Sequence, residues 1–274
     1  KLLELGFQEE MATIISRLPV RRQTLLFSAT MPDKVLNLVR EYLTRPRVMN
    51  AGGSNASTLP ASLVLRGHIV NAADQKPAAL FHIITRPDAG SSLVFANTRD
   101  RVEELTRFLK GRGLAAEALH GKMLQPERDK SMMKLRNGSA TVLVATDVAA
   151  RGLDIADLPA VFNFDVPYNA EDYVHRIGRT GRAGADGTAS NLVCLDEEGF
   201  MQDIERFTKQ NIEKVVVPGF EAEPGEKAEP LAMGRQTIWG GLGKPPSRDV
   251  MQAAAKAART EMLQRVRDSK GANG

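Results

Sequence analysis

The hydrophobic positions in the first 50 residues follow a helical period twice. Apolar residues recur three or four positions apart in Gly6–Leu18 and again in Val35–Leu43, as on the buried face of an amphipathic helix. Pro32 precedes the second run, where the first turn of a helix tolerates proline. A short apolar run between the two, Gln23–Phe27, predicts a strand. These elements are typical of the end of an α/β unit.

Further along the chain, from residue 63 to residue 217, short apolar runs alternate with amphipathic helical runs. The expected strands are Val64–Val70, Ser92–Ala96, Ala115–Leu119, Thr141–Ala145, Ala160–Phe164, Ala189–Leu195 and Val215–Val217. The expected helices are Asp74–Thr85, Arg101–Lys110, Pro126–Arg136, Ala170–Ile177 and Glu197–Lys209. Alternation of this kind predicts an α/β fold with a mainly parallel sheet, helices on both faces and ligand-binding loops at the carboxyl ends of the strands.

Two other segments have no such alternation. Residues 51–62 are mostly small and polar, which predicts a flexible linker between domains. After Pro218 the sequence is rich in Pro, Gly and Glu and then becomes basic, so residues 218–274 are expected to form a basic tail that is partly helical or disordered. One helix is expected there, from Asp249 to about Asp268. Trp239 is compatible both with stacking on a base and with packing against the domain.

Composition narrows the class of protein. The chain has 274 residues, 42% hydrophobic and 26% charged, which is normal for globular domains and excludes disorder throughout. A net charge of +4 is compatible with a nucleic-acid partner and equally with other enzymes. The single cysteine, Cys194, cannot build a disulfide framework or a cysteine-based metal site. Without a membrane-length apolar stretch or a signal-peptide layout, a cytoplasmic protein is predicted. Because position 1 is not Met, we expect a piece of a longer chain.

Two loops concentrate the chemistry. The run His175–Arg182 holds three arginines and two glycines in eight residues. Glycine lets a backbone approach phosphate closely, and arginine offers a planar fork of donors, so the run predicts phosphate binding; for any one arginine, a solvated basic turn is the alternative. The run Ala145–Asp154 follows an apolar strand, where α/β sheets place their ligand crevice. In this second run, Thr146 or Asp147 could equally be a helix cap.

The motifs, taken in order, resemble those of DEAD-box RNA helicases. They are Ser28-Ala29-Thr30, Leu93–Thr98, Leu119-His120-Gly121, Gln125–Arg128, Ala145–Asp154 and His175–Arg182. His175 with Ile177 and Thr180 favours the DEAD-box branch, because related helicases of the DEAH and RecQ types usually carry Gln at the first position. The resemblance implies two RecA-like domains. Residues 1–50 would be the C-terminal remnant of the first, ATP-binding domain, and residues 63–217 the second, helicase C-terminal domain.

The resemblance also implies roles in ATP hydrolysis. In similar enzymes the second domain lends charge to a nucleotide held by the first, so Arg179 and Arg182 are implied as arginine fingers at the γ-phosphate. His175 would join the network between the domains. Asp154, with Gly152 nearby, would lie at the ribose. Ser28 and Thr30 belong to the motif that couples hydrolysis to unwinding.

A second set of residues is implied on the RNA side. The resemblance suggests backbone contacts for Thr98, Gly121, Gln125, Arg128 and Thr146, with Arg151 close to the same interface. Hydroxyl, amide and glycine donors of this kind position a strand without reading its sequence. Capping of the following helices is the alternative for Thr98 and Gln125. Phe95 lies within an apolar strand and is expected in the core rather than stacked on RNA.

The sequence departs from the family's pattern in one large respect. It contains neither a Gly-x-x-x-x-Gly-Lys-Ser/Thr phosphate loop nor an Asp-Glu-Ala-Asp box. No metal ligands are therefore expected in these residues, and the ligands of Mg²⁺ and the phosphate cradle for ATP are expected in a missing N-terminal portion. The intact protein is predicted to be an ATP-dependent RNA helicase that unwinds short duplexes or remodels ribonucleoproteins, with RNA and ribonucleoprotein or RNA-decay proteins as partners. The alternatives are a DNA-directed superfamily 2 helicase and a non-catalytic module that binds RNA or a partner protein.

Overall fold

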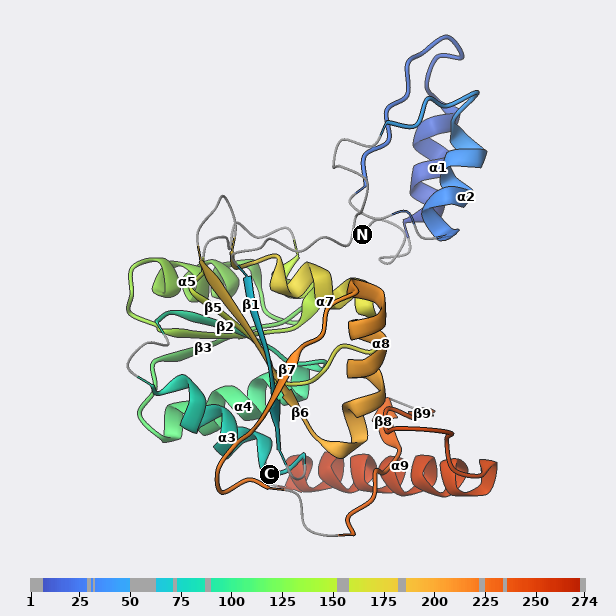
Figure 1. Ribbon diagram of the computed structural model, residues 1–274. Helices are drawn as coiled ribbons and strands as arrows, with labels where there is room; N and C mark the ends of the chain where they lie inside the picture. Colours follow the sequence, from blue (N-terminus) through green and yellow to red (C-terminus); the bar gives the residue numbers. More distant parts are fainter. Residues whose placement is uncertain are drawn as a thin grey trace. The chain divides into compact units, whose positions relative to one another are not determined.

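The computed structural model describes residues 7–28, 31, 33–49, 63–70, 73–86, 90–151, 158–181, 186–221, 225–233 and 236–271 (Figure 1). The chain divides into two compact units, Lys1–Thr58 and Leu59–Gly274. The linker predicted at residues 51–62 lies outside the described residues. Within these residues no helix is long and apolar enough to cross a membrane.

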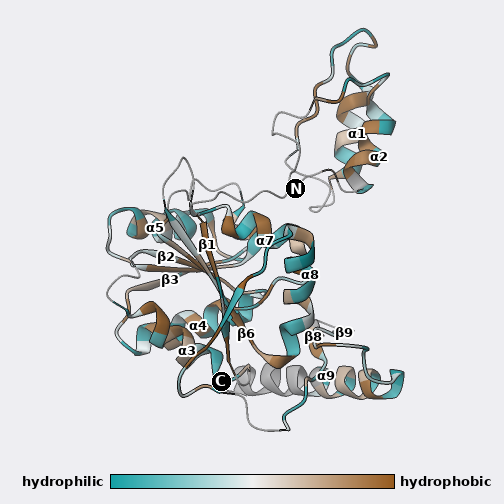
Figure 2. Ribbon diagram, in the orientation of Figure 1, coloured by the Kyte–Doolittle hydropathy of each residue, from teal (hydrophilic) through white to brown (hydrophobic). Residues whose placement is uncertain are grey.

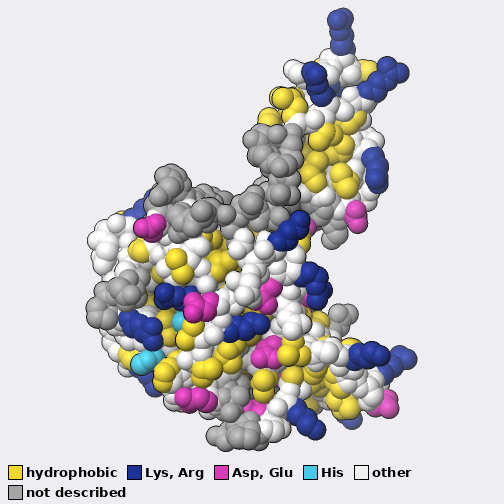
Figure 3. Space-filling view, viewed as in Figure 1, with side chains coloured by type: hydrophobic (Ala, Val, Ile, Leu, Met, Phe, Trp, Pro, Cys, Tyr) yellow, Lys and Arg dark blue, Asp and Glu magenta, His cyan; other side chains and the backbone are white. Residues whose placement is uncertain are grey.

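The first unit contains the two expected helices, α1 (Gln8–Ser16) and α2 (Asp33–Tyr42). The strand predicted at Gln23–Phe27 is wrong, because this segment forms no regular secondary structure. A strand needs neighbours for its N–H and C=O groups, and the described part of this unit has no other strand. Its apolar side chains therefore stay uncovered: Phe27 is 90% exposed. Figure 3 shows further hydrophobic side chains gathered on the surface of this unit.

The second unit is built on a seven-stranded sheet in which every pairing is parallel. The strands are β1 (Leu63–Ile69), β2 (Ser92–Phe95), β3 (Ala116–Leu119), β4 (Val142–Ala145), β5 (Ala160–Asn163), β6 (Gly187–Val193) and β7 (Glu213–Val216). Their order across the sheet is β3-β4-β2-β5-β6-β1-β7. The predicted α/β fold with a mainly parallel sheet is confirmed.

Helices connect the strands and cover both faces of the sheet (Figure 1). They are α3 (Lys76–Ile84), α4 (Arg99–Gly111), α5 (Gln125–Arg136), α6 (Asp147–Ala150), α7 (Ala170–Ile177) and α8 (Glu198–Thr208), the last preceded by the 3₁₀ turn η1 (Leu195–Glu197). The five longer helices were expected. The single turn of α6 was not, because four residues are too few to display a hydrophobic period.

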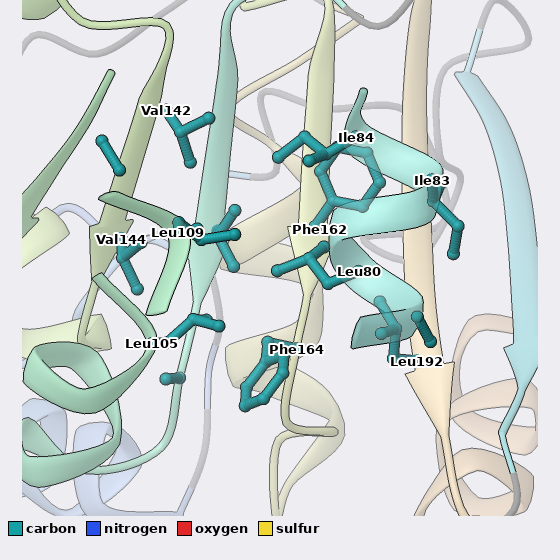
Figure 4. Packing of buried hydrophobic residues seen from close by; sticks show 14 of the residues in the cluster. Leu80, Ile83, Ile84, Leu105, Leu109, Val142, Val144, Phe162, Phe164 and Leu192 are labelled. Carbon is teal, nitrogen blue, oxygen red and sulfur yellow. The ribbon is translucent and has the colours of Figure 1, made fainter. Parts of the chain in front are cut away.

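Alternation along the strands divides the core into layers. In β2, Val94 packs with α3 and α4 on one face, while Leu93 and Phe95 pack with α5 and α6 on the other. Figure 4 shows the first layer, where Leu80 and Leu109 lie beside Phe162 and Val144. The central strands β2, β4 and β5 are buried along their whole length and are largely apolar, because both of their faces are covered (Figure 2).

The residues after 217 continue this unit rather than leaving it. A short antiparallel hairpin, β8 (Leu231–Met233) and β9 (Gln236–Ile238), precedes α9 (Arg248–Gly271), which corresponds to the helix expected there. The amide of Gly199 donates to the carbonyl of Gly240 over 2.6 Å. A Cβ atom on Gly240 would lie 2.3 Å from the carbonyl oxygen of Asp196, so this close backbone crossing requires glycine. The appendage is thereby packed against the start of α8.

Candidate nucleotide and RNA interface

The carboxyl ends of β2, β4 and β5 converge on one buried arginine from α7. Arg176 is 1% exposed. Its Nε and Nη2 donate to the two carboxylate oxygens of Asp147, both over 2.7 Å. Its Nη1 donates to Oδ1 of Asn163 over 3.2 Å and to the carbonyl of Asp165 over 2.7 Å, and Nη2 also donates to Oδ1 of Asn97 over 2.6 Å. All five donors of the guanidinium are used.

The surroundings of Arg176 compensate for burying its charge. A bidentate carboxylate is the strongest partner that arginine has in proteins, and Asp147 supplies it at the first position of α6. On one side the guanidinium lies 5.2 Å from the centre of the Phe95 ring. Phe95 is only 2% exposed, so the expectation that it belongs to the core is confirmed. Arg176 is therefore a structural centre of the site, and none of its five donors is left for a ligand.

Asp165 extends this network toward α4. Its carboxylate accepts the Asn97 amide over 2.9 Å and Nη2 of Arg101 over 3.1 Å. Burial acts to raise the pKa of the Asp165 carboxyl, but the charges of Arg101 and Lys76 outweigh burial, so the pKa lies below its usual value. Asp165 is therefore ionised and holds the start of the β2–α4 connection in place.

The predicted catalytic residues His175 and Arg179 lie close together at the surface of this network. Both are partly exposed, and both line a shallow pocket with Asp147, Arg151 and Arg176. Nδ1 of His175 is buried and has no hydrogen-bond partner among the described residues, which is uncommon for a buried polar atom. An acceptor or donor from another molecule or domain would satisfy it.

A tight turn follows α7 and carries Arg179. Thr180 is 1% exposed, and its hydroxyl donates to the carbonyl of Leu158. Gly181 has φ +65°, a conformation that favours glycine. A Cβ atom on Gly187 would lie 2.5 Å from Oγ1 of Thr180, so the turn packs directly on the first residue of β6. Within the run 175–182, these residues fix the backbone and leave Arg179 at the pocket.

Arg151 joins α6 to α7. It is the residue directly after α6, and its guanidinium forms an ion pair with Asp172 in the first turn of α7. The Asp172 amide in turn donates to Oδ1 of Asn169 over 2.8 Å, which caps that helix. Arg151 therefore lies in the same pocket as His175 and Arg179, and its contact with RNA stays a prediction.

The predicted RNA contacts differ in their local roles. Oγ1 of Thr98 accepts the amide of Arg101 over 3.3 Å and caps α4. Gln125 is the first residue of α5 rather than its cap, and its Nε2 donates to Oδ1 of Asp129 over 2.8 Å. Thr98 thus caps the helix that follows it, as one of the two interpretations expected, whereas Gln125 does not. Gly121 lies exposed in the turn after β3.

Arg128 and Thr146 both border α6. Nη2 of Arg128 donates to the carbonyl of Ala149 over 3.1 Å, while its Nε is buried without a hydrogen-bond partner among the described residues. Thr146 occupies the position before α6, but its side chain makes no capping hydrogen bond. Both side chains therefore lie beside α6, where the Arg128 Nε has no partner among the described residues and the Thr146 hydroxyl caps no helix.

Several predicted site residues lie elsewhere. Thr30, Gly152, Asp154 and Arg182 are outside the described residues. Ser28 belongs to the first unit and is exposed. In the described part of the chain, no group of three or more His, Cys, Asp or Glu side chains could hold a metal ion.

The residues that build the centre of the network were not assigned this role from the sequence. These are Asn97, Asp147, Asn163, Asp165 and Arg176. Arg176 was instead one of three arginines in the run predicted to bind phosphate, and for Arg176 that prediction is wrong because its side chain is buried and all of its donors are used within the fold. Asn163 did carry a signal, since it is the one polar side chain in the buried strand β5. Its Nδ2 donates to Oδ1 of Asn191 in β6 over 2.8 Å, so a polar chain crosses the sheet beneath the site.

The chain is similar in sequence to a known domain family and to curated helicases. Residues 75–184 match the helicase conserved C-terminal domain. The chain is 40% identical over 224 residues to the DEAD-box ATP-dependent RNA helicase CshA of Geobacillus kaustophilus, covering 80% of this chain and 46% of that protein. The CshA of Bacillus cereus is 39% identical over 218 residues, covering 80% of this chain and 41% of that protein. The chain thus spans less than half the length of these curated relatives.

Solved structures of DEAD-box proteins are also similar to this chain. The E. coli DEAD-box protein SrmB, determined bound to the regulator of ribonuclease activity A, is 37% identical with a TM-score of 0.57, covering 61% of this chain and 98% of that one. S. cerevisiae Dbp5 bound to RNA and ADP BeF3 is 26% identical with a TM-score of 0.70, covering 79% of this chain and 57% of that one.

Proposed function

The chain belongs to the DEAD-box helicase family, and we propose that it contributes the second RecA-like domain to an ATP-dependent RNA helicase. In the whole protein, hydrolysis of ATP stimulated by RNA would drive local duplex unwinding or ribonucleoprotein remodelling. The observation that carries the proposal is the pocket on α7, where the partly exposed His175 and Arg179 lie beside Arg176, whose five donors are all hydrogen-bonded.

The residues that the structure describes do not fit the binding of Mg²⁺, and the sequence offers no phosphate cradle. No described cluster could hold a metal, and the sequence has no phosphate loop. Mg²⁺ held elsewhere in the protein would neutralise charge on the phosphates of ATP. The contribution expected of this chain is positive charge: Arg179 and Arg182 would act at the γ-phosphate, and Gly152 and Asp154 would act at the ribose.

Arginine fingers have a large effect in phosphoryl transfer, about 10³ to 10⁵ in rate, because the charge that they stabilise develops in the transition state. Such a gain requires that the guanidinium be held in place before the reaction. The amide of Arg179 donates to the carbonyl of Arg176 over 3.2 Å, so the finger residue is tied to the buried centre of the network. His175, whose Nδ1 has no hydrogen-bond partner among the described residues, would gain one from a group outside them.

RNA would bind along the edge of the sheet that carries Thr98, Gly121, Gln125, Arg128 and Thr146, with Arg151 next to it. The Arg128 Nε has no hydrogen-bond partner among the described residues, and the Thr146 hydroxyl does not cap α6; both observations support this assignment. Donors of this kind hold a sugar–phosphate backbone, and contacts with the 2′-OH would distinguish RNA from DNA.

The proposal is tested by ATP hydrolysis of the whole protein without nucleic acid, with single-stranded RNA and with DNA of the same sequence. Stimulation by RNA alone is expected. Equal stimulation by DNA would favour a DNA-directed helicase of the same superfamily. Tight RNA binding without hydrolysis under any condition would favour a non-catalytic binding module.

A further inference from the structure

A buried ion pair lies directly beneath the site. Lys76 is 1% exposed and Glu197 4% exposed, and their side chains form a salt bridge. Lys76 is also the first residue of α3, where the positive end of the helix disfavours a cation. Removing two charges from water is costly, and a well-packed apolar pair is often as stable. The position of the pair therefore suggests a task beyond holding the fold together.

The pair clamps three consecutive residues of the loop after β5. Nζ of Lys76 donates to the carbonyl of Phe164 over 2.8 Å. Oε1 of Glu197 accepts the amide of Val166 over 3.1 Å. Burial alone would lower the pKa of Lys76, but the Glu197 carboxylate raises it above its usual value, so Lys76 remains charged. Both ends of the loop are thus fixed by one salt bridge.

The middle residue of the loop, Asp165, faces the site. Its carbonyl accepts Nη1 of Arg176 over 2.7 Å, and its carboxylate accepts the amide of Asn97 over 2.9 Å. The amide of Arg179 donates to the carbonyl of Arg176 over 3.2 Å. An unbroken series of contacts therefore runs from the ion pair through Asp165 and Arg176 to the finger arginine.

We propose that Lys76 and Glu197 are positioning residues for Arg179: they fix the loop Phe164–Val166, which fixes Arg176 and the end of α7. This role rests on the proposed function, in which Arg179 meets the nucleotide. Neither member of the pair touches the pocket. Lys76 and Glu197 affect the rate of ATP hydrolysis by restricting the positions that Arg179 can adopt.

The test variant is Lys76→Met/Glu197→Met, which removes both charges together and leaves no unpaired one. Lys76→Met/Glu197→Gln is a milder second variant, because the amide oxygen of Gln can still accept the Val166 amide. The matched control replaces an exposed ion pair with its uncharged counterparts, Arg206→Gln/Asp203→Asn; that pair is 2.9 Å apart with side chains 75% and 66% exposed.

The first readout uses this chain alone and does not depend on catalysis. The Nε–H of Arg176 is buried and bound to Asp147, so its NMR signal should exchange slowly with water; Arg176→Lys assigns it. In the double Met variant the signal should lose protection at least tenfold, while circular dichroism shows a folded protein. The Gln variant should retain most of the protection, and the control should retain all of it.

The second readout is kcat of the whole protein at saturating ATP and RNA. The double Met variant should lose at least tenfold in kcat, with KM for RNA changed less than twofold, and the Gln variant should recover part of the loss. A folded double variant with an unchanged Arg176 signal overturns the proposal, whatever happens to kcat. If the unaltered protein does not hydrolyse ATP, the proposed function fails, but the Arg176 signal still decides whether the pair positions the network.

Discussion

Replacing Arg176 with Met is the sharpest perturbation of the network. The substitution keeps much of the side-chain volume but removes all five donors. Asp147 would lose its charge partner, and the acceptors on Asn97, Asn163 and Asp165 would lose theirs. Because these groups are held by strand ends and helix starts, they cannot easily turn toward water.

The size of the effect follows from burial. Breaking a buried ion pair by removing one partner costs about 3 to 5 kcal/mol. The Asp147 side chain is 21% exposed and keeps some contact with water, so the lower end, about 3 kcal/mol, is expected. For a unit of this size, each kcal/mol lowers Tm by roughly 2 to 4 °C, so Tm should fall by about 6 to 12 °C.

The assay is urea unfolding of the 274-residue chain followed by circular dichroism, with Tm measured in parallel. Arg206→Gln is the control, since this exposed arginine forms a surface ion pair with the exposed Asp203; its loss should cost less than about 0.5 kcal/mol. A loss below about 1 kcal/mol for Arg176→Met would refute the interpretation of Arg176 as the structural centre of the site.

Three further predictions concern single groups. Thr98→Val should destabilise the second unit by about 1 kcal/mol and Thr98→Ser by much less, because the hydroxyl that caps α4 is lost only in the first variant. Equal losses of stability for the two variants in urea unfolding would argue against the cap. Burial, helped by the charges of Arg86 and Arg66, lowers the pKa of His68 to about 4, so between pH 6.5 and pH 4 the unfolded chain binds a proton that the folded chain does not. The free energy of unfolding should therefore be at its full value above about pH 6.5 and fall by on the order of 2 to 3 kcal/mol as the pH drops toward 4. The same dependence on pH in His68→Gln would contradict this. Burial raises the pKa of the Cys194 thiol to about 12, so Ellman's reagent should label the folded chain only as fast as it unfolds, and rapid stoichiometric labelling would be the opposite result.

Much of the second unit could be predicted from the hydrophobic pattern, because strands buried on both faces are continuous apolar runs between helices. Leu93, Val94 and Phe95 illustrate this: all three are buried, with alternate residues in different layers. The order of the strands could not be predicted this way, since the pairing of β1 with β6 joins residues more than 100 positions apart. The same pattern failed at Gln23–Phe27, because apolar character indicates a tendency to be covered and says nothing about a partner strand.

The residues of the site, too, could be predicted only in part from the sequence. The family motifs indicated Arg179 and His175, and the structure places both in one pocket. Arg176 lies between them in sequence, in a run that reads as basic and exposed, yet it is almost fully buried. Its burial depends on Asp147, which is 29 positions away, and on Asn163 from a neighbouring strand. Contacts of that kind arise only from the packing of α7 across the strand ends.

The central claim is that this chain supplies a finger arginine to a nucleotide bound elsewhere in the protein. The most direct measurement is single-turnover ATP hydrolysis by the whole protein, with saturating RNA, for the unaltered protein, Arg179→Ala and Arg182→Ala. Each variant should hydrolyse ATP at least about 10³ times more slowly while binding RNA with nearly unchanged affinity. A variant that keeps more than about a tenth of the rate would contradict the claim for that arginine.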